Sequence, residues 1–146
     1  MKSKLLYLLL SVTVLASSCV GNKATPTPVN YPVGTFSGQF SLIRTNAQTG
    51  VHDTSKAIIQ LTMNSNYGYT VTGDTATVHA GSHGTYAINA TYVDFSDATY
   101  PKTGIPTKTH LNGDYEYYYD GSSVLQMLAT SPLDTIVLQY DLKKTN

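Results

Sequence analysis

The sequence predicts an all-β domain in which about eight antiparallel strands form an up-and-down meander that closes into a barrel. Three observations predict it. Strand-forming Tyr and Thr and turn-forming Gly and Asn dominate the composition, with 12 Tyr and 11 Gly in 146 residues. From residue 33 onward, apolar and polar residues alternate with a period of two, and turn signals separate the runs. Closure removes the edge strands of a meander, and a β-sandwich is the alternative fold.

The first predicted strand, VGTFSGQFSLIR from residue 33, shows the clearest alternation. One face carries Gly34, Phe36, Gly38, Phe40 and Leu42, and the other face is polar. Glycines on an inner face indicate that the strand bends or approaches a neighbouring backbone closely. We therefore expect this strand to form part of the barrel wall with its aromatic residues inside.

The remaining alternation predicts further strands that continue to residue 144. Ser82 and Asn89 belong to two of the predicted turns, and residues 97–110, which contain Pro101 and Pro106, form a predicted long loop. The predicted inner faces include Ala57, Ile59, Leu61 and Met63 in the second run, and Tyr67, Tyr69 and Val71 in the third. The predicted strands cover residues 33–44, 55–63, 66–73, 75–79, 84–88, 91–96, 111–120, 123–130 and 134–144.

The first 19 residues, MKSKLLYLLLSVTVLASSC, have the layout of a secretory signal. Lys2 and Lys4 form a basic start, an apolar run extends from Leu5 to Ala16, and small residues lead to Cys19. The apolar run is shorter than the roughly 20 residues that a membrane-spanning helix needs. Cys19 is the only cysteine in the chain.

The stretch LASSC resembles the cleavage site of bacterial lipoprotein precursors. It departs from that pattern because Ala16 stands where Leu is usual, with Leu15 one position early. The resemblance implies cleavage between Ser18 and Cys19 and acylation of Cys19, which becomes the new N-terminus. An ordinary secretory signal that leaves a free thiol is the alternative.

This resemblance implies three segments: a signal peptide (1–18), a lipid-anchored, proline-containing tether (19–32) and the barrel domain (33–146). The anchor implies the membrane as a partner and the bacterial cell envelope as the location. By resemblance to lipoproteins of diderm bacteria, the absence of Asp just after Cys19 implies the outer membrane, facing the periplasm.

The start GTFSGQF and the finish YDLKK resemble the lipocalin-like superfamily of small barrels, in the style of small lipoproteins of Bacteroidota. That family has Gly-x-Trp on its first strand and a basic residue near its last strand that stacks over the Trp. Gly34 and Phe36 stand at the first motif, and Lys143 or Lys144 at the second. A barrel of eight strands is just wide enough to be filled by side chains or to hold one small ligand.

Tyrosines gather in the stretch DYEYYYDGSS from residue 114. The alternation places Tyr115, Tyr117 and Tyr119 inside and Tyr118 outside. Buried tyrosine hydroxyls need hydrogen-bond partners, so these residues serve either plain packing or a polar ligand lining. The candidate lining residues are Phe36, Phe40, Tyr67, Tyr69, Tyr115, Tyr117 and Tyr119.

The sequence offers few candidates for metal-binding or catalytic residues. His79 and His83 flank a predicted turn near Asp74, a set that could bind zinc or copper, although exposed polar residues at a hairpin end are the interpretation we favour. The acidic pairs Asp94 with Asp97, and Asp114 with Glu116, are expected to be solvated. No catalytic motif is present, and we expect neither an enzyme nor a cofactor.

The charge balance excludes one class of partner. Without Lys2 and Lys4, 9 − 2 = 7 basic residues face 9 acidic ones, which gives no electrostatic footprint for nucleic acid. Two functions remain. The first is a membrane-anchored module that binds a small, partly apolar ligand in the barrel. The second is a structural or inhibitory protein with a filled core and loops that contact an unknown protein partner.

Overall fold

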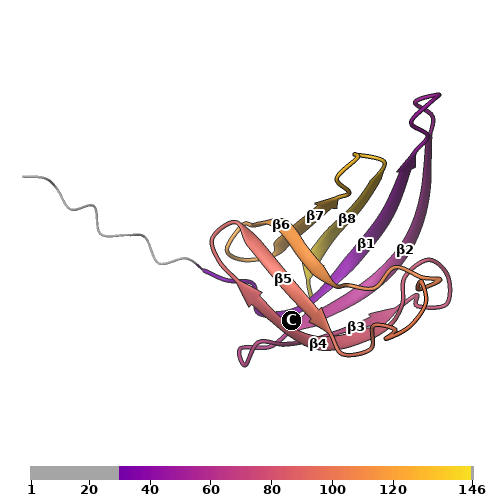
Figure 1. Cartoon of the computed structure of the whole chain (residues 1–146). Coiled ribbons are helices and arrows are strands. Elements are labelled where there is room, and N and C mark those ends of the chain that lie inside the picture. Colours follow the sequence, from indigo (N-terminus) through magenta and orange to yellow (C-terminus); the bar gives the residue numbers. More distant parts are fainter. Residues whose placement is uncertain (1–29, 146) are drawn as a thin grey trace, which may run out of the picture.

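The computed structural model describes residues 30–145, which form a closed barrel of eight antiparallel strands in chain order (Figure 1). The predicted all-β meander and its closure are confirmed, in preference to a β-sandwich. No helix of this part of the chain has the length and apolar character needed to cross a bilayer. The strands are β1 (Gly34–Thr45), β2 (His52–Met63), β3 (Gly68–Gly73), β4 (Ser82–Ile88), β5 (Tyr92–Asp97), β6 (Gly113–Tyr119), β7 (Val124–Thr130) and β8 (Ile136–Lys144).

The barrel closes where β1 pairs with β8. Gly38 of β1 stands opposite Leu142 of β8. A Cβ atom at Gly38 would collide with the carbonyl oxygen of Asp141 and lie 3.0 Å from the Cα of Leu142. Only glycine allows the two backbones to approach this closely, as the glycine on the inner face predicts.

The segment between β3 and β4 differs from the prediction. Residues 75–79 form turns instead of a strand, and His79 makes only a single parallel bridge with Thr109. The backbone amide of Ala80 donates to the Thr109 carbonyl, and the Thr109 amide donates to the Val78 carbonyl (2.8 and 2.9 Å). The loop between β5 and β6 thus satisfies these backbone groups in place of a neighbouring strand. Ser82, an expected turn residue, begins β4.

Aromatic side chains fill the middle of the barrel. The ring of Phe95 contacts those of Tyr69 and Tyr115, with centroids 4.9 and 5.9 Å apart. The ring of Tyr140 contacts those of Tyr115 and Phe40 at 5.6 and 4.9 Å. All five residues are at most 2% exposed. The predicted inner faces of β1 and β2 belong to the same core, which confirms their alternation.

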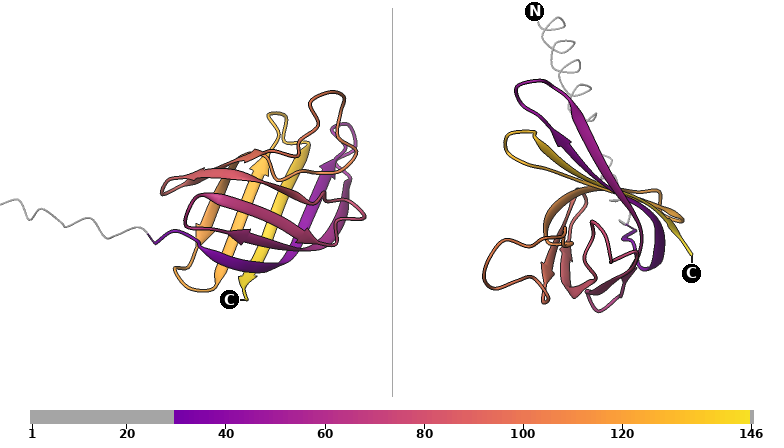
Figure 2. Two further views of the ribbon diagram at one scale, coloured as in Figure 1. Left: turned by 90° about the horizontal axis from the view of Figure 1, so that it is seen from below. Right: turned by 90° about the vertical axis from the view of Figure 1, so that its right-hand side faces the viewer.

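The two ends of the barrel differ (Figure 2). One end, called here the open end, carries the loops that follow β1, β3, β5 and β7. The described chain enters at the opposite end, where the Asn30 side-chain amide donates to the Gly121 carbonyl in the β6–β7 turn (2.8 Å). The open end therefore lies away from the point where the chain enters the domain.

Candidate functional site

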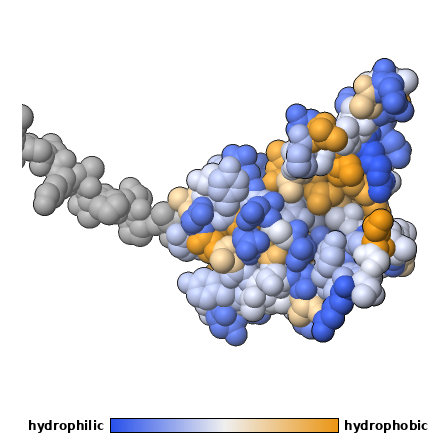
Figure 3. Space-filling view, viewed as in Figure 1, coloured by the Kyte–Doolittle hydropathy of each residue, from blue (hydrophilic) through white to orange (hydrophobic). Residues whose placement is uncertain are grey.

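A cleft of about 320 Å3 lies at the open end of the barrel, between β1, β8 and the β5–β6 loop. Its apolar wall includes Leu42 of β1 and Ile136 and Leu138 of β8. Figure 3 shows apolar surface gathered near the hairpins at this end, with hydrophilic surface around it. The cleft, which we call the end cleft, is of the size that accommodates a small molecule.

The β5–β6 loop, residues 98–112, forms the other wall of the end cleft. Its backbone is fixed to the β3–β4 loop through Thr109, and the Lys108 ammonium donates to the Thr75 carbonyl at 2.7 Å. The buried side chain of Leu111 anchors the end of the loop in the core. These contacts hold the loop in a defined position although it lacks regular secondary structure.

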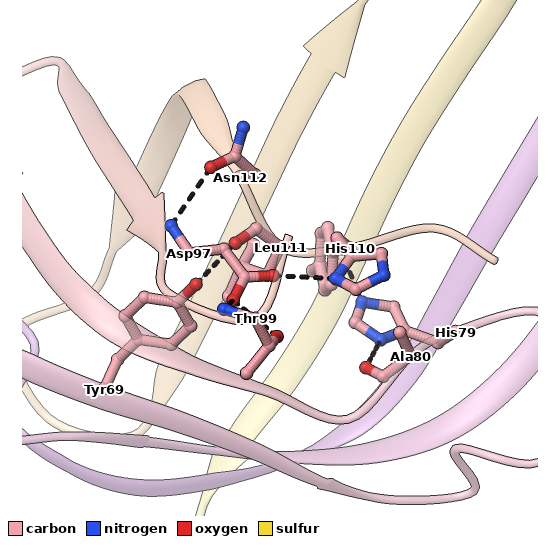
Figure 4. A network of polar contacts seen from close by, with 9 residues as sticks. Tyr69, His79, Ala80, Asp97, Thr99, His110, Leu111 and Asn112 are labelled. Atoms are coloured by element: carbon pink, nitrogen blue, oxygen red, sulfur yellow. Dashed lines mark hydrogen bonds and ion pairs between the residues drawn. The ribbon is translucent and has the colours of Figure 1, made fainter. Parts of the chain in front are cut away.

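Asp97, behind the wall of the end cleft, and His110, which lines it, form an organised polar group (Figure 4). The Asp97 side chain is fully buried, and its Oδ2 lies 2.7 Å from His110 Nδ1. Its Oδ1 accepts hydrogen bonds from the Thr99 amide and hydroxyl at 2.7 and 2.6 Å. The backbone amide of Asp97 donates to Asn112 Oδ1 at 3.0 Å. The carboxylate thus has the donors that a buried charge requires.

The contact with Asp97 determines the orientation of the His110 ring. A carboxylate only accepts hydrogen bonds, so Nδ1 carries the hydrogen and Nε2 remains for another partner. His110 lines the end cleft, and its ring contacts that of Tyr100 edge-on at 5.4 Å. Nε2 can therefore accept a hydrogen bond from a bound molecule, or donate one when the ring is protonated.

His79 lies in the core below the end cleft. Its Nδ1 donates to the Ala80 carbonyl at 2.6 Å, and its Nε2 accepts from the Tyr140 hydroxyl at 2.9 Å. Burial lowers the pKa of His79, although the hydrogen bond to Ala80 opposes that shift. The expectation of an exposed His79 at a hairpin end is therefore wrong.

His83 lies apart from His79. It is exposed on β4, whereas His79 is fully buried, so the structure does not bring the two rings to one face of a turn. Within residues 30–145, no group of three or more His, Cys, Asp or Glu side chains could hold a metal ion. A metal site at His79 and His83 thus has no geometric support.

The predicted lining residues fall into three groups. Phe36, Phe40, Tyr69 and Tyr115 point inward as predicted, but they pack against other core side chains and do not line the end cleft. The inward position predicted for Tyr67 is wrong, because this residue has a φ of 64° in the β2–β3 turn and is 58% exposed.

Tyr117 and Tyr119, the third group, are half-buried near the other end of the barrel. Their hydroxyls donate to the carbonyls of Asn89 (2.7 Å) and Ser122 (3.3 Å). Tyr118 is 59% exposed, as predicted. The tyrosine-rich strand therefore divides between core, rim and surface, and does not form a single platform.

The interior tyrosines meet the predicted need for hydroxyl partners only in part. Tyr69 donates to the Leu111 carbonyl at 2.6 Å. The Tyr115 hydroxyl makes no hydrogen bond within the described chain, and burial raises its pKa to about 12. The interior is thus a packed aromatic core with a few polar contacts.

A basic side chain of β8 lies near the Phe36 ring of β1. The Lys144 ammonium lies 5.9 Å from the centre of the Phe36 ring, and Phe36 stands opposite Lys144 in the pairing of β1 with β8. Lys143 stands opposite Ser37. Of the two lysines considered, Lys144 and not Lys143 therefore covers the aromatic ring.

Sequence reasoning missed the residues of the end cleft. Asp97 was expected to be solvated, but its side chain is fully buried. The signal was present, because Asp97 continues the inward positions of Val93 and Phe95 along β5. Arg44 carries the same signal, since it continues the inward positions of Phe40 and Leu42 along β1. His110 and Lys108 lie in a loop and carry none.

Searches against protein-family models, curated proteins and solved structures found no match to this chain. The function of the end cleft therefore has to be argued from its own geometry.

Proposed function

We propose that this chain is a lipid-anchored protein of the bacterial cell envelope and that its barrel binds a small, partly apolar ligand in the end cleft. The observation that carries the proposal is the cleft of about 320 Å3, with an apolar wall and an ordered Asp97–His110 pair, at the open end of a barrel whose middle is filled. A mixture of apolar walls with a few fixed polar groups is typical of small-molecule sites.

The filled middle supports a ligand position at the end of the barrel. An eight-stranded barrel is just wide enough to be filled by side chains or to hold one small ligand. Phe36, Phe40, Tyr69, Tyr115 and Tyr140 use that space, and each is at most 2% exposed. A ligand in the middle would have to displace these rings, whereas the end cleft is already open.

The proposed anchor agrees with the direction of the barrel. Cys19 and the cleavage site at Ser18 lie outside the described residues, so their roles rest on the sequence. The chain enters the domain beside Gly121, at the end opposite the end cleft. A tether to a membrane would leave the end cleft directed away from the lipid surface.

Acylation is tested by comparing the full chain with its Cys19→Ser variant in a diderm bacterial host. Metabolic labelling with palmitate and fractionation should place labelled wild-type protein in the outer membrane, with the variant unlabelled and released from it. Two or three acyl chains anchor a protein stably, so the difference should be clear. Unlabelled wild-type protein would contradict the anchor.

Ligand binding is tested by native mass spectrometry of the chain after incubation with an extract of cellular small molecules. Ile136→Trp would fill the mouth of the end cleft, and Leu133→Trp is the matched control, since Leu133 is 82% exposed on the same hairpin and does not line the cleft. A ligand should be retained by the wild type and the control and lost from Ile136→Trp. Retention of the ligand by all three proteins would exclude the end cleft as its site.

The exposed loop residues favour the second candidate, a protein that contacts a partner through its open end. Val51, Ile105 and Leu133 are 65%, 94% and 82% exposed, and all three lie in loops at this end. A double variant, Ile105→Ser with Leu133→Ser, should lose a partner captured by cross-linking in cells and should retain any ligand of the end cleft. If partner capture is unchanged, these loops do not form the interaction surface.

A further inference from the structure

The end cleft is positively charged. Its lining includes Arg44, Lys108 and His110, and no Asp or Glu. Asp97 lies behind the His110 ring with its side chain fully buried. The whole chain has equal numbers of basic and acidic residues, so this concentration of basic groups is local. A bound molecule with a negative charge would meet attraction here.

Arg44 and Lys108 retain hydrogen-bond donors for a ligand. Lys108 uses one of its three ammonium hydrogens on the Thr75 carbonyl. Arg44 is exposed near the end of β1, and the only carboxylate opposite it, Asp53 on β2, makes no ion pair with it within the described chain. Arginine and lysine with free donors form strong, charge-assisted hydrogen bonds to carboxylates.

His110 is prepared to become a third cation. Its Nδ1–H donates to Asp97, so uptake of a proton at Nε2 would give an imidazolium held by a buried carboxylate. The other groups around it are Arg44, Lys108, the Tyr100 ring and, below it, His79, which burial keeps neutral. A carboxylate only accepts hydrogen bonds, so it can contact Nε2 only when that atom carries a hydrogen, and its binding is thereby coupled to proton uptake.

We propose that the ligand of the end cleft is an amphiphilic carboxylate, a molecule with one carboxylate group on an apolar body. The carboxylate contacts Arg44, Lys108 and His110, and the apolar body lies against Leu42, Ile136 and Leu138. This proposal rests on the proposed function and names the class of its ligand. An inorganic anion would bind the basic groups but leave the apolar wall exposed to water. A neutral apolar molecule would leave the basic groups without a partner.

The test compares decanoate with the neutral 1-decanol by isothermal titration, with the mature chain carrying Cys19→Ser. Decanoate should bind at least about tenfold more tightly than decanol, because one hydrogen bond to a charged group contributes about that factor. Arg44→Gln should weaken decanoate about tenfold and leave decanol unchanged. Lys108→Gln also removes the contact of the loop with Thr75 and should weaken decanoate by at least as much. The matched control is Lys102→Gln, which removes a lysine of the same loop outside the cleft lining and should change neither ligand.

Proton uptake gives a second readout. Titrations of decanoate at one pH in buffers of different ionisation enthalpy should show uptake of a fraction of a proton by the wild type and none by His110→Gln. Equal affinity for decanoate and decanol would overturn the charged class and leave the ligand cleft in place. If neither molecule binds, and no cellular extract supplies a ligand, both proposals fail.

Discussion

His79 should make the barrel sensitive to acid. The ring is fully buried, donates from Nδ1 to the Ala80 carbonyl and accepts at Nε2 from the Tyr140 hydroxyl. A second proton on Nε2 would turn this atom from acceptor into donor, so the Tyr140 hydroxyl would have to rotate and accept, and a charge would stand in the core. Burial has the larger effect and lowers the pKa of His79, with a smaller opposing effect of the Ala80 bond.

The sign of the effect follows from proton linkage. The unfolded chain binds a proton at this residue near pH 6.5, and the folded chain binds it only at lower pH. Between these values the unfolded state holds more protons, so the free energy of unfolding falls as the pH falls, by up to about 1.4 kcal/mol per pH unit. The contribution of neutral His79 is thus fully present above about pH 6.5 and is lost below it.

Urea unfolding of the wild type, His79→Phe and the exposed control His83→Gln between about pH 7.5 and about pH 5.5 measures this contribution. The wild type and His79→Phe share every other titratable group, so the difference between their slopes isolates residue 79, and His83→Gln shows what the loss of an exposed histidine does. His79→Phe should be less stable near neutral pH, because Ala80 and Tyr140 lose a partner, and should lose less stability on acidification. Equal slopes for the wild type and His79→Phe would refute the reasoning.

Three further predictions concern the core, the closure of the barrel and one turn. Phe95→Ala should lower the free energy of unfolding by about 3–5 kcal/mol, measured with urea, because Phe95 is 1% exposed and contacts three aromatic rings. Gly38→Ala should lower the free energy of unfolding by about 1–3 kcal/mol or more in the same urea assay. An unchanged free energy of unfolding would contradict the close approach of β1 to β8. The pKa of Asp120, measured by carboxyl NMR, should lie well below its usual range, since its oxygens accept from the amides of Val124, Ser122 and Ser123; an ordinary value would contradict this turn geometry.

The barrel wall could be predicted from the sequence because the period of a strand is strict. In β2, Ala57, Ile59, Leu61 and Met63 are all buried and the residues between them are not. Tyr67 shares the parity of Tyr69 and Val71 but precedes β3, and its φ of 64° changes the side on which its ring lies. Alternation therefore fails at the first residue outside the ladder.

The end cleft could not be predicted, because long-range contacts of loops create it. Asp97 and His110 are 13 residues apart in the sequence. The Thr109 backbone joins their loop to Val78 and Ala80 of the β3–β4 loop. No periodic pattern relates these positions. Two parts of the site could have been inferred. Asp97 follows the inward positions of Val93 and Phe95, and an inward carboxylate needs donors. Arg44 follows the inward positions of Phe40 and Leu42.

The two parts of the barrel interior suit different molecules, and this difference supports a ligand at the open end. Removal of the Phe40 ring would leave a cavity walled by aromatic groups, and such a cavity takes neutral apolar molecules. The end cleft combines an apolar wall with basic groups that face solvent, so a ligand can leave it without any opening of the core. The hydrogen bonds of Tyr69 with Leu111 and of His79 with Tyr140 lie below it and fix its floor. Ligand exchange should therefore leave the packed core of the barrel intact.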